Sequence, residues 1–289
     1  MYQTKTELLA GIQERFPQLG RGQKKVAQYV LTHTEEVAFL TAAQLGKNVG
    51  VSEATVVRFA SLLGYDGFPD LQTHIQNMMR QDISTITRLE KRAEEQAVQS
   101  SKSILQTIVE ADQTNLSLFL QDTSEETFTQ AVDMIVNAKE IYVCGLRSSF
   151  SLAHFFWFSL RFFLPKVHLI TPGIGDLPEQ LLFANEHDVF IGMNTKRYAK
   201  ATIEIAQALK KHHVPIIGIV DNMMSPLTPL TDIQFIVRSD VSSFIESEVV
   251  PMSLINALVT AVALKHTSKT VEELSRLENT FDELGTYAM

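Results

Sequence analysis

Two short stretches of the sequence place hydroxyl groups and cations where a strand-like run of residues gives way to a helical one. The first stretch contains Gly145, Arg147, Ser148 and Ser149. A glycine turn, hydroxyls and the unpaired N–H groups of a helix N-terminus favour an anion, because the helix dipole and the free donors both attract negative charge. An arginine adds a donor fork that fits phosphate. The stretch therefore indicates an anion-binding loop, although many strand-to-helix turns use Gly and Ser only as caps.

The second stretch follows the third strand-like run and contains Asn194, Thr195, Lys196, Arg197 and Tyr198, with another lysine two residues on. Three cations crowd the start of a predicted helix, where positive charges oppose the helix dipole unless an anion neutralises them. The alternative is a solvated loop without a ligand. Two such loops at neighbouring strand ends favour a real site, and we predict that together they hold one anionic ligand.

A third stretch, TAAQLGKNVGVSEATVVRFASLLGY from residue 41, has the pattern of two helices joined by a tight turn. Thr41 and Gln44 can form a capping box at the start of the first helix, and Gly50 can end it. Ser52 can cap the second helix. The small Gly46 permits close helix approach, and we expect three apolar side chains to pack inward: Val51, Val56 and Leu62.

The start of the second helix in this pair offers side chains suited to reading DNA. A recognition helix contacts base edges in the major groove with its N-terminal half. Arg58 can bind guanine or phosphate, and Thr55 can bind phosphate or a thymine methyl group. We predict a DNA-contacting set comprising Ser52, Glu53, Ala54, Thr55 and Arg58. The alternative is an ordinary helical hairpin that binds nothing.

These stretches lie in two regions with different hydrophobic periodicity. Up to about residue 80, apolar residues recur every three or four positions, which indicates an all-helical domain over residues 1–80. A polar helical linker is predicted over 81–103. From residue 140, short apolar runs (IYVCG, VHLI, DVFIGM, PIIGIV and IQFIV) alternate with helical ones, which predicts a five-stranded parallel sheet flanked by helices over 104–289. Ligands of such sheets bind at the carboxyl ends of the strands, in the loops after Cys144, Ile170, Met193 and Val220.

Length and composition agree with two globular domains. The chain has 289 residues, of which 45% are hydrophobic. A single cysteine, Cys144, argues against a disulfide framework and a cysteine-rich zinc site. The sequence starts without a signal-peptide pattern and no apolar run reaches about 18 residues. We therefore expect a cytoplasmic protein with no membrane segment.

Net charge is unevenly distributed between the two regions. The whole chain carries a formal charge of −8, but residues 1–80 hold eight Lys and Arg against seven Asp and Glu, a net charge of +1. A charge of +1 is weak for binding a polyanion. We therefore expect the protein to need a homodimer or homotetramer for useful DNA affinity.

Residues 16–71, with RGQKKVAQYVL, LTHTEEVAFLTAAQL and GVSEATVVRFASLLGYDGFPDLQ, resemble the N-terminal domain of RpiR/MurR-type regulators. Residues 125–266, with Ser149 and the SPL of residues 225–227, resemble the sugar isomerase (SIS) domain that follows it in those proteins. The usual Ser-x-Ser-Gly-x-Thr signature is replaced here by Asn194, Lys196, Arg197 and Ala199, although a subgroup carries Arg-Tyr at the place of Arg197 and Tyr198. This replacement puts the standard ligand geometry in question.

The resemblance implies a transcription regulator that binds a double-stranded DNA operator and senses a small phosphorylated sugar, with no cofactor, no metal and no catalytic residues. One alternative is a phosphosugar isomerase or aminosugar lyase, which needs a general base. Candidates by residue type alone are Glu246 and Glu248, near the start of the last long helix, and His187. A second alternative is a SIS domain that serves only oligomerisation. The sequence does not fix the ligand or the direction of its effect on DNA binding.

Overall fold

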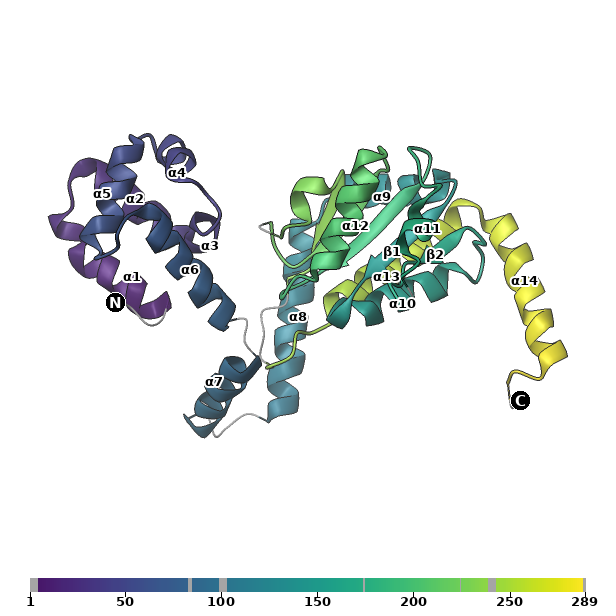
Figure 1. Ribbon diagram of the computed structural model, residues 1–289. Helices are drawn as coiled ribbons and strands as arrows, with labels where there is room; N and C mark the ends of the chain where they lie inside the picture. Colours follow the sequence, from purple (N-terminus) through teal and green to yellow (C-terminus); the bar gives the residue numbers. More distant parts are fainter. Residues whose placement is uncertain are drawn as a thin grey trace. The chain divides into compact units, whose positions relative to one another are not determined.

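The structure is a computed structural model, and it describes residues 5–82, 85–98, 103–173, 175–223, 225–238 and 243–287. The chain divides into two compact units, Met1–Val98 and Gln99–Met289 (Figure 1). The division falls inside the segment 81–103, for which the sequence predicts a linker. The two units are described separately.

The first unit is helical throughout its described residues. Its elements are α1 (Lys5–Arg15), the 3₁₀ turn η1 (Phe16–Gln18), α2 (Arg21–Thr32), α3 (Thr34–Val37), α4 (Ala42–Val49), α5 (Glu53–Leu62), α6 (Phe68–Asp82) and α7 (Thr85–Val98). One apolar cluster fills its centre, to which α1, α2, α4, α5 and α6 all contribute. The helix α7 packs against the end of α6.

The two helices α4 and α5 form the predicted helix-turn-helix, and its local signals are confirmed. Thr41 and Gln44 make the capping box, with each side chain bonded to the other residue's backbone N–H, at 3.2 and 2.8 Å. Gly50 ends α4 in the left-handed conformation, with φ of 68°. A Cβ atom on Gly46 would lie 2.8 Å from the carbonyl oxygen of Val51, so glycine lets α4 approach the turn closely.

One packing prediction for this motif is wrong. Leu62 is 49% exposed, whereas the next residue, Leu63, is buried. The inner face of α5 is formed by Val56, Phe59 and Ala60, and a side chain three or four residues further on continues that face. Leu63 satisfies this spacing from both Phe59 and Ala60, while Leu62 projects to the side of it.

The second unit is an α/β domain built around a parallel sheet. Two helices, α8 (Ile104–Asp122) and α9 (Glu125–Asn137), precede the strands. The strands are β1 (Ile141–Gly145), β2 (Val167–Leu169), β3 (Val189–Asn194), β4 (Ile216–Val220) and β5 (Ile233–Ile236). They pair in the order β2-β1-β3-β4-β5, and every pair is parallel. The predicted five-stranded parallel sheet is confirmed, because strands buried on both faces give the continuous apolar runs of the sequence.

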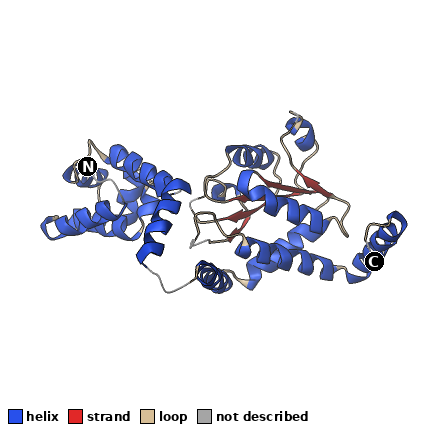
Figure 2. Ribbon diagram, turned by 90° about the horizontal axis from the view of Figure 1, so that it is seen from below, coloured by secondary structure: helices blue, strands red, loops and turns tan. Residues whose placement is uncertain are grey.

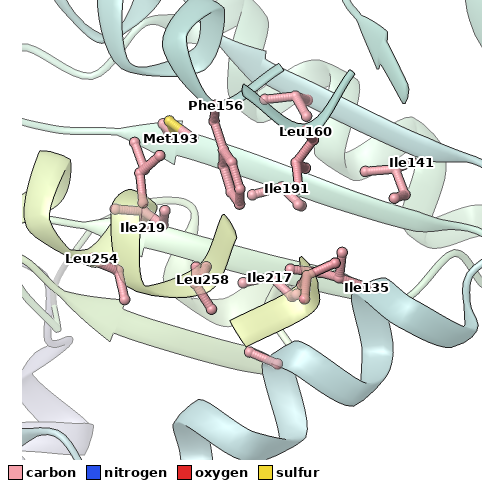
Figure 3. Close-up of a cluster of buried hydrophobic side chains, with 14 of the residues drawn as sticks. Ile135, Ile141, Phe156, Leu160, Ile191, Met193, Ile217, Ile219, Leu254 and Leu258 are labelled. Atoms are coloured by element: carbon pink, nitrogen blue, oxygen red, sulfur yellow. The ribbon is translucent and has the colours of Figure 1, made fainter. Parts of the chain in front are cut away.

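Helices cover both faces of this sheet (Figure 2). The helices α9, α10 (Phe150–Leu160) and α13 (Val249–Lys265) pack on one face, where Ile191, Phe156 and Leu258 meet in the core (Figure 3). On the other face lie α11 (Leu177–Leu181), α12 (Lys200–Lys211) and the 3₁₀ turn η3 (Thr228–Leu230). The remaining elements are the 3₁₀ turn η2 (Arg147–Ser149) and a C-terminal helix, α14 (Thr267–Leu284).

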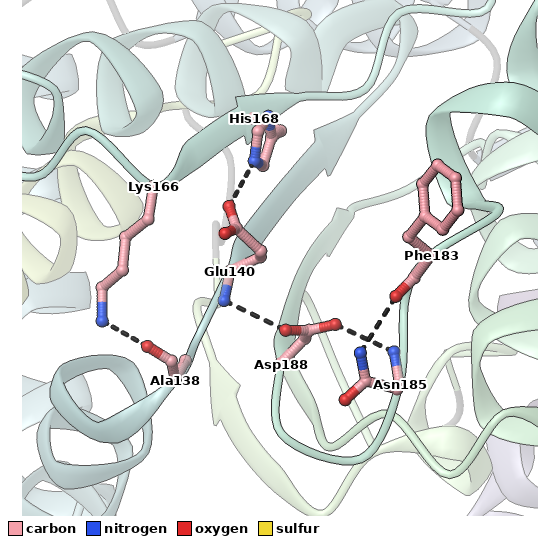
Figure 4. A network of polar contacts seen from close by, with 7 residues as sticks. All are labelled: Ala138, Glu140, Lys166, His168, Phe183, Asn185 and Asp188. Atoms are coloured by element: carbon pink, nitrogen blue, oxygen red, sulfur yellow. Dashed lines mark hydrogen bonds and ion pairs between the residues drawn. The ribbon is translucent and has the colours of Figure 1, made fainter.

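Buried polar bonds fix the amino ends of the strands (Figure 4). The carboxylate of Asp188, which is buried, accepts from the backbone N–H of Glu140 at 3.0 Å and from that of Asn185 at 2.8 Å. The Nζ of Lys166 donates to the carbonyl oxygen of Ala138. These bonds fix the segments that lead into β1, β2 and β3.

Candidate nucleic-acid interface and ligand site

The outer face of α5 carries most of the predicted DNA-contacting set. Ser52, Glu53, Ala54 and Arg58 are exposed, as the sequence predicts. Thr55 is half-buried, and its hydroxyl lies 2.9 Å from that of Ser52. Ser52 stands at the N-cap position, but its hydroxyl pairs with Thr55 and makes no side-chain bond to the helix backbone. These two hydroxyls therefore already have a partner when DNA is absent.

Sequence reasoning missed two further residues on this face. Val57 is 37% exposed, and Ser61 is also exposed. Val57 follows Glu53 and Ala54 at helical spacings of four and three, and Ser61 follows Arg58 at a spacing of three, which is the signal that would have found them. Val57 is therefore an exposed apolar side chain among the polar residues of this face.

At the carboxyl edge of the sheet, the loop after β1 makes a tight turn into α10. A Cβ atom on Gly145 would lie 2.5 Å from the carbonyl oxygen of Ser149, so this turn requires glycine. Arg147 adopts a left-handed backbone with φ of 59° and is exposed. Ser149 is buried at the N-cap of α10, and its side chain makes no cap bond to that helix. The first N–H groups of α10 are therefore left without a side-chain cap at this edge.

The loop after β3 is anchored by the side chain of Asn194, which is buried. Its Oδ1 accepts from the backbone N–H of Ala199 at 2.8 Å, and this bond closes the loop before α12 begins. Arg197 also has a left-handed backbone, with φ of 68°. The hydroxyls of Ser149 and Thr195 lie 3.3 Å apart, so the structure brings the two predicted loops together.

A buried carboxyl group completes this edge at the end of β4. Asp221 is 4% exposed, and its Oδ2 accepts from Asn222 at 2.8 Å and from the hydroxyl of Tyr198 at 3.4 Å. Burial raises the pKa of Asp221 to about 6, partly offset by the positive charge of Lys196. The sequence predicts that the loop after Val220 helps to bind a ligand. It does not single out Asp221, because one aspartate in a loop forms no recognisable motif.

Two buried polar atoms of this edge have no hydrogen-bond partner among the described residues. They are Nδ2 of Asn194, a donor, and Oδ1 of Asp221. Buried polar groups are nearly always paired, and an unpaired one costs about 1 to 3 kcal/mol. A ligand with both acceptor and donor groups would satisfy them.

The structure separates the three candidate general bases. His187 lies beside Asp188 at the amino edge, where its carbonyl oxygen accepts from Lys139, so the sheet lies between it and the loops described above. Glu246 and Glu248 precede α13, which follows the carboxyl end of β5. Burial, and then the charge of Glu246, raises the pKa of Glu248 to about 7. The raised pKa of Glu248 is suited to proton transfer near neutral pH.

The comparisons with known proteins cover both units. Residues 6–82 match the helix-turn-helix domain of the rpiR family, and residues 134–261 match the SIS domain. The chain therefore combines an rpiR-family helix-turn-helix domain with a C-terminal SIS domain, the architecture of a transcriptional regulator.

Relatives of known name are distant but span nearly the whole chain. The HTH-type transcriptional regulator HexR of Escherichia coli is 24% identical, over 96% of this chain and 94% of its own length. HexR of Pseudomonas aeruginosa is 23% identical, over 89% and 90%. These relatives are regulators rather than enzymes.

Two solved structures share the fold. The Vibrio vulnificus NanR protein, complexed with ManNAc-6P, is 18% identical, with a TM-score of 0.62 over 98% of this chain and 100% of its own. The sugar isomerase domain of an RpiR transcription factor from Sphaerobacter thermophilus is 22% identical, with a TM-score of 0.57 over 60% of this chain and 96% of its own.

Within the described part of the chain, no single helix is long and apolar enough to span a membrane. The pair α13 and α14 meets the criteria of length and composition only when the two are joined, and they are bent by 108° at their junction.

Proposed function

We propose that this regulator binds a small phosphorylated sugar at the carboxyl edge of the SIS sheet, and that binding changes its affinity for a double-stranded DNA operator. The observation that carries the proposal is the meeting of two loops, linked through Ser149 and Thr195, in which Arg147 and Arg197 each hold a left-handed backbone. Such a conformation costs an arginine about 1 kcal/mol or more, and strain of this kind gathers at functional sites.

The chemistry of these loops supports an anionic group. The helices α10 and α12 begin at the two loops, and neither has a side-chain hydrogen bond that caps its N-terminus. Unpaired N–H groups and the helix dipoles favour phosphate there, with Arg147, Lys196 and Arg197 supplying charge. The fold that this chain shares with NanR, which was solved with ManNAc-6P, gives independent support.

Asn194 and Asp221 extend the proposal to the uncharged part of the ligand. A sugar hydroxyl can accept from Nδ2 of Asn194 and donate to Oδ1 of Asp221, the two atoms left unpaired. Phosphate would then lie toward the arginines, and the sugar ring would lie toward the end of β4.

The ligand is tested by calorimetric titration of the full chain with N-acetylmannosamine 6-phosphate, with hexose 6-phosphates and with the matching unphosphorylated sugars. Arg147→Ala with Arg197→Ala should abolish binding of the phosphorylated compound. The matched control, Lys139→Ala with Lys211→Ala, removes two exposed cations remote from these loops and should bind normally. A neutral sugar that binds more tightly than its phosphate, or a fully responsive double variant, would disprove the assignment.

On the DNA side, we propose that two copies of α5 enter successive major grooves, with contacts from Ser52, Glu53, Ala54, Thr55 and Arg58 and an added apolar contact from Val57. Two half-sites about 34 Å apart fit a dimer, so the operator should be palindromic. A homodimer or homotetramer is part of this proposal.

Aldose-ketose isomerisation remains the second candidate, and the raised pKa of Glu248 is the observation in its favour. It is tested by incubating the chain with each phosphorylated sugar and following the carbonyl-bearing carbon by NMR. If the native chain converts a phosphorylated sugar and the Glu248→Gln variant does not, the carboxyl edge is a catalytic site rather than a sensing site.

A further inference from the structure

The helix α10 is apolar on all sides, although only one of its sides is buried within the chain. Leu152, Phe156 and Leu160 face the core. On the opposite side Phe150 and Phe158 are 39% and 49% exposed, and Phe162, just after the end of the helix, is 37% exposed. A helix that is hydrophobic all round normally has both sides covered, and a contiguous exposed apolar patch on a folded domain marks an interaction surface.

The exposed rings form one continuous row, which we call the aromatic face. His154 lies between Phe150 and Phe158, with ring centroids 6.0 and 6.3 Å away, and Phe158 contacts Phe162 edge-on at 4.9 Å. A cleft of about 440 Å³, lined by Trp157, Arg161 and the edge strand β2, lies beside the end of α10. The cleft adjoins the aromatic face through Trp157, whose ring lies 5.4 Å from that of His154.

The C-terminal helix α14 is amphipathic and has almost no cover of its own. Its apolar residues recur at intervals of three and four: Val271, Leu274, Leu277, Phe281 and Leu284. The structure describes all of α14, and Thr270 is its buried residue, while Val271 and Leu284 are 56% and 74% exposed. An 18-residue helix is marginal in water unless its apolar stripe packs against something.

The bend at His266 keeps this stripe away from its own domain. The axes of α13 and α14 turn by 108° there, and α14 leaves the body of the unit (Figure 1). Among the described elements, α14 packs closely only against α13, so its stripe is left without cover from the sheet or from α10.

The charges of the two surfaces are complementary. The helix α14 carries five carboxylates and two cations. Residues 150–169, which contain the aromatic face, have no Asp or Glu and include the exposed cation Arg161, whereas Lys166 is bonded to the carbonyl of Ala138 and His168 is paired with Glu140. Opposite charges around two apolar surfaces favour their association and fix its register.

We propose that α14 of one copy covers the aromatic face of α10 in a second copy, and that the reciprocal exchange forms the homodimer. A twofold axis makes the contact occur twice, so each chain covers the other's exposed rings. The inference goes beyond ligand binding and does not depend on which ligand, if any, the carboxyl edge holds.

The contact is tested by crosslinking the full chain through introduced cysteines. The native Cys144 is buried and its pKa is raised to about 12, so it will not react. His154→Cys lies on the aromatic face and Ser275→Cys flanks the stripe of α14. With a short bismaleimide, the chain carrying both changes should form covalent dimers, and each single variant should stay monomeric under denaturing conditions.

Every other crosslinking pattern overturns the proposal. Dimers of the Ser275→Cys variant alone would mean that α14 pairs with itself, and dimers of His154→Cys alone would mean that α10 does. A double variant that crosslinks only within one chain would mean that α14 folds back on its own domain.

An independent measurement is the mass of the full chain in solution. Leu277→Glu or Phe158→Glu should raise the dimer dissociation constant at least about 100-fold, because a charge would be buried in the contact. Asn279→Glu adds the same charge to the polar side of α14 and should leave the dimer intact, and circular dichroism checks that all variants fold. A monomeric native chain, or a dimer unaffected by both interface changes, would contradict the exchange.

Discussion

At the scale of single residues, Arg58 is the side chain on which DNA specificity should depend most. It is exposed on the outer face of α5, where a guanidinium can bond to guanine with two parallel hydrogen bonds. Arg58→Ala should weaken binding to an operator selected from random DNA by about 1 to 3 kcal/mol, with little change in stability. Titrations against operator and scrambled DNA at one salt concentration measure the loss.

Arg58→Lys separates base reading from charge. Lysine keeps the attraction to phosphate but loses the bidentate fork, so affinity for scrambled DNA should persist while discrimination falls. If both variants discriminate as well as the native chain, specificity resides elsewhere on α5, with Val57 and Glu53 the next residues to change.

Asp221 should make the stability of the second unit depend on pH. Its pKa is raised by burial to about 6, against about 3.9 for an unfolded aspartate. The folded state therefore holds the proton more tightly, and the resulting stability is complete below about pH 4 and is lost as the pH rises through about 6. A shift of this size corresponds to roughly 3 kcal/mol.

Asp221→Asn should remove this dependence because an amide does not ionise. We expect the variant to match the native chain at pH 4 and to be more stable at pH 8, by up to roughly 3 kcal/mol, in urea unfolding. Glu186→Gln, which changes an exposed carboxylate, is the control and should alter neither value. The raised pKa of Glu248 gives stability a pH dependence of the same sign. Glu248 is present in both the native chain and Asp221→Asn, so the difference in stability between these two isolates the contribution of Asp221. An unchanged pH profile would mean that Asp221 stays solvated.

At the scale of elements, the turn between α4 and α5 depends on the left-handed backbone of Gly50. An added Cβ atom would lie 3.7 Å from Nζ of Lys25, which is ordinary contact, so only the conformation is costly. Gly50→Ala should destabilise the first unit by about 1 to 2 kcal/mol, and Gly50→Asn by less, because asparagine tolerates this region. Thermal unfolding measures both. Equal stability of the alanine variant would show that the turn relaxes to another conformation.

Elements were predictable from the sequence where local signals and tertiary packing agree. The central strands β1, β3 and β4 are buried throughout and read as nearly unbroken apolar runs, and Thr41, Gln44 and Gly50 mark α4 by capping chemistry alone. Leu62 was misplaced because two adjacent leucines fit the helical period almost equally well. The break between α13 and α14 carries no local signal in the sequence, because His266 is neither glycine nor proline.

The candidate site was only partly predictable, for a physical reason. Gly145 and Asn194 end apolar strands, and Ser149 lies in the turn that follows the first of them. Because parallel strands bring their carboxyl ends to one edge of the sheet, the order of these residues in the sequence predicts that they lie close together. Asp221 belongs to the same edge, but its burial depends on Tyr198 and Asn222 from a folded loop. No spacing rule in the sequence reports such a contact.

At the scale of the whole molecule, DNA affinity should come from linking two weak binding units. Residues 1–80 have a net charge of only +1, so one unit gains little from releasing counterions. Joining two units converts the second contact into an intramolecular event, which raises affinity by about 100-fold or more without any new contact. Each unit must then reach its own half-site.

We therefore expect residues 1–98 alone to bind a palindromic operator at least about 100-fold more weakly than the full chain does, at the same salt concentration. The full-length Leu277→Glu variant should fall between them, since its units remain folded while the dimer is weakened, and it should recover at high protein concentration. Asn279→Glu should bind as the native chain does. Fluorescence anisotropy with one and two half-sites gives each affinity. If the isolated unit binds as tightly as the full chain, the second unit contributes nothing to DNA affinity, and its role is confined to the ligand.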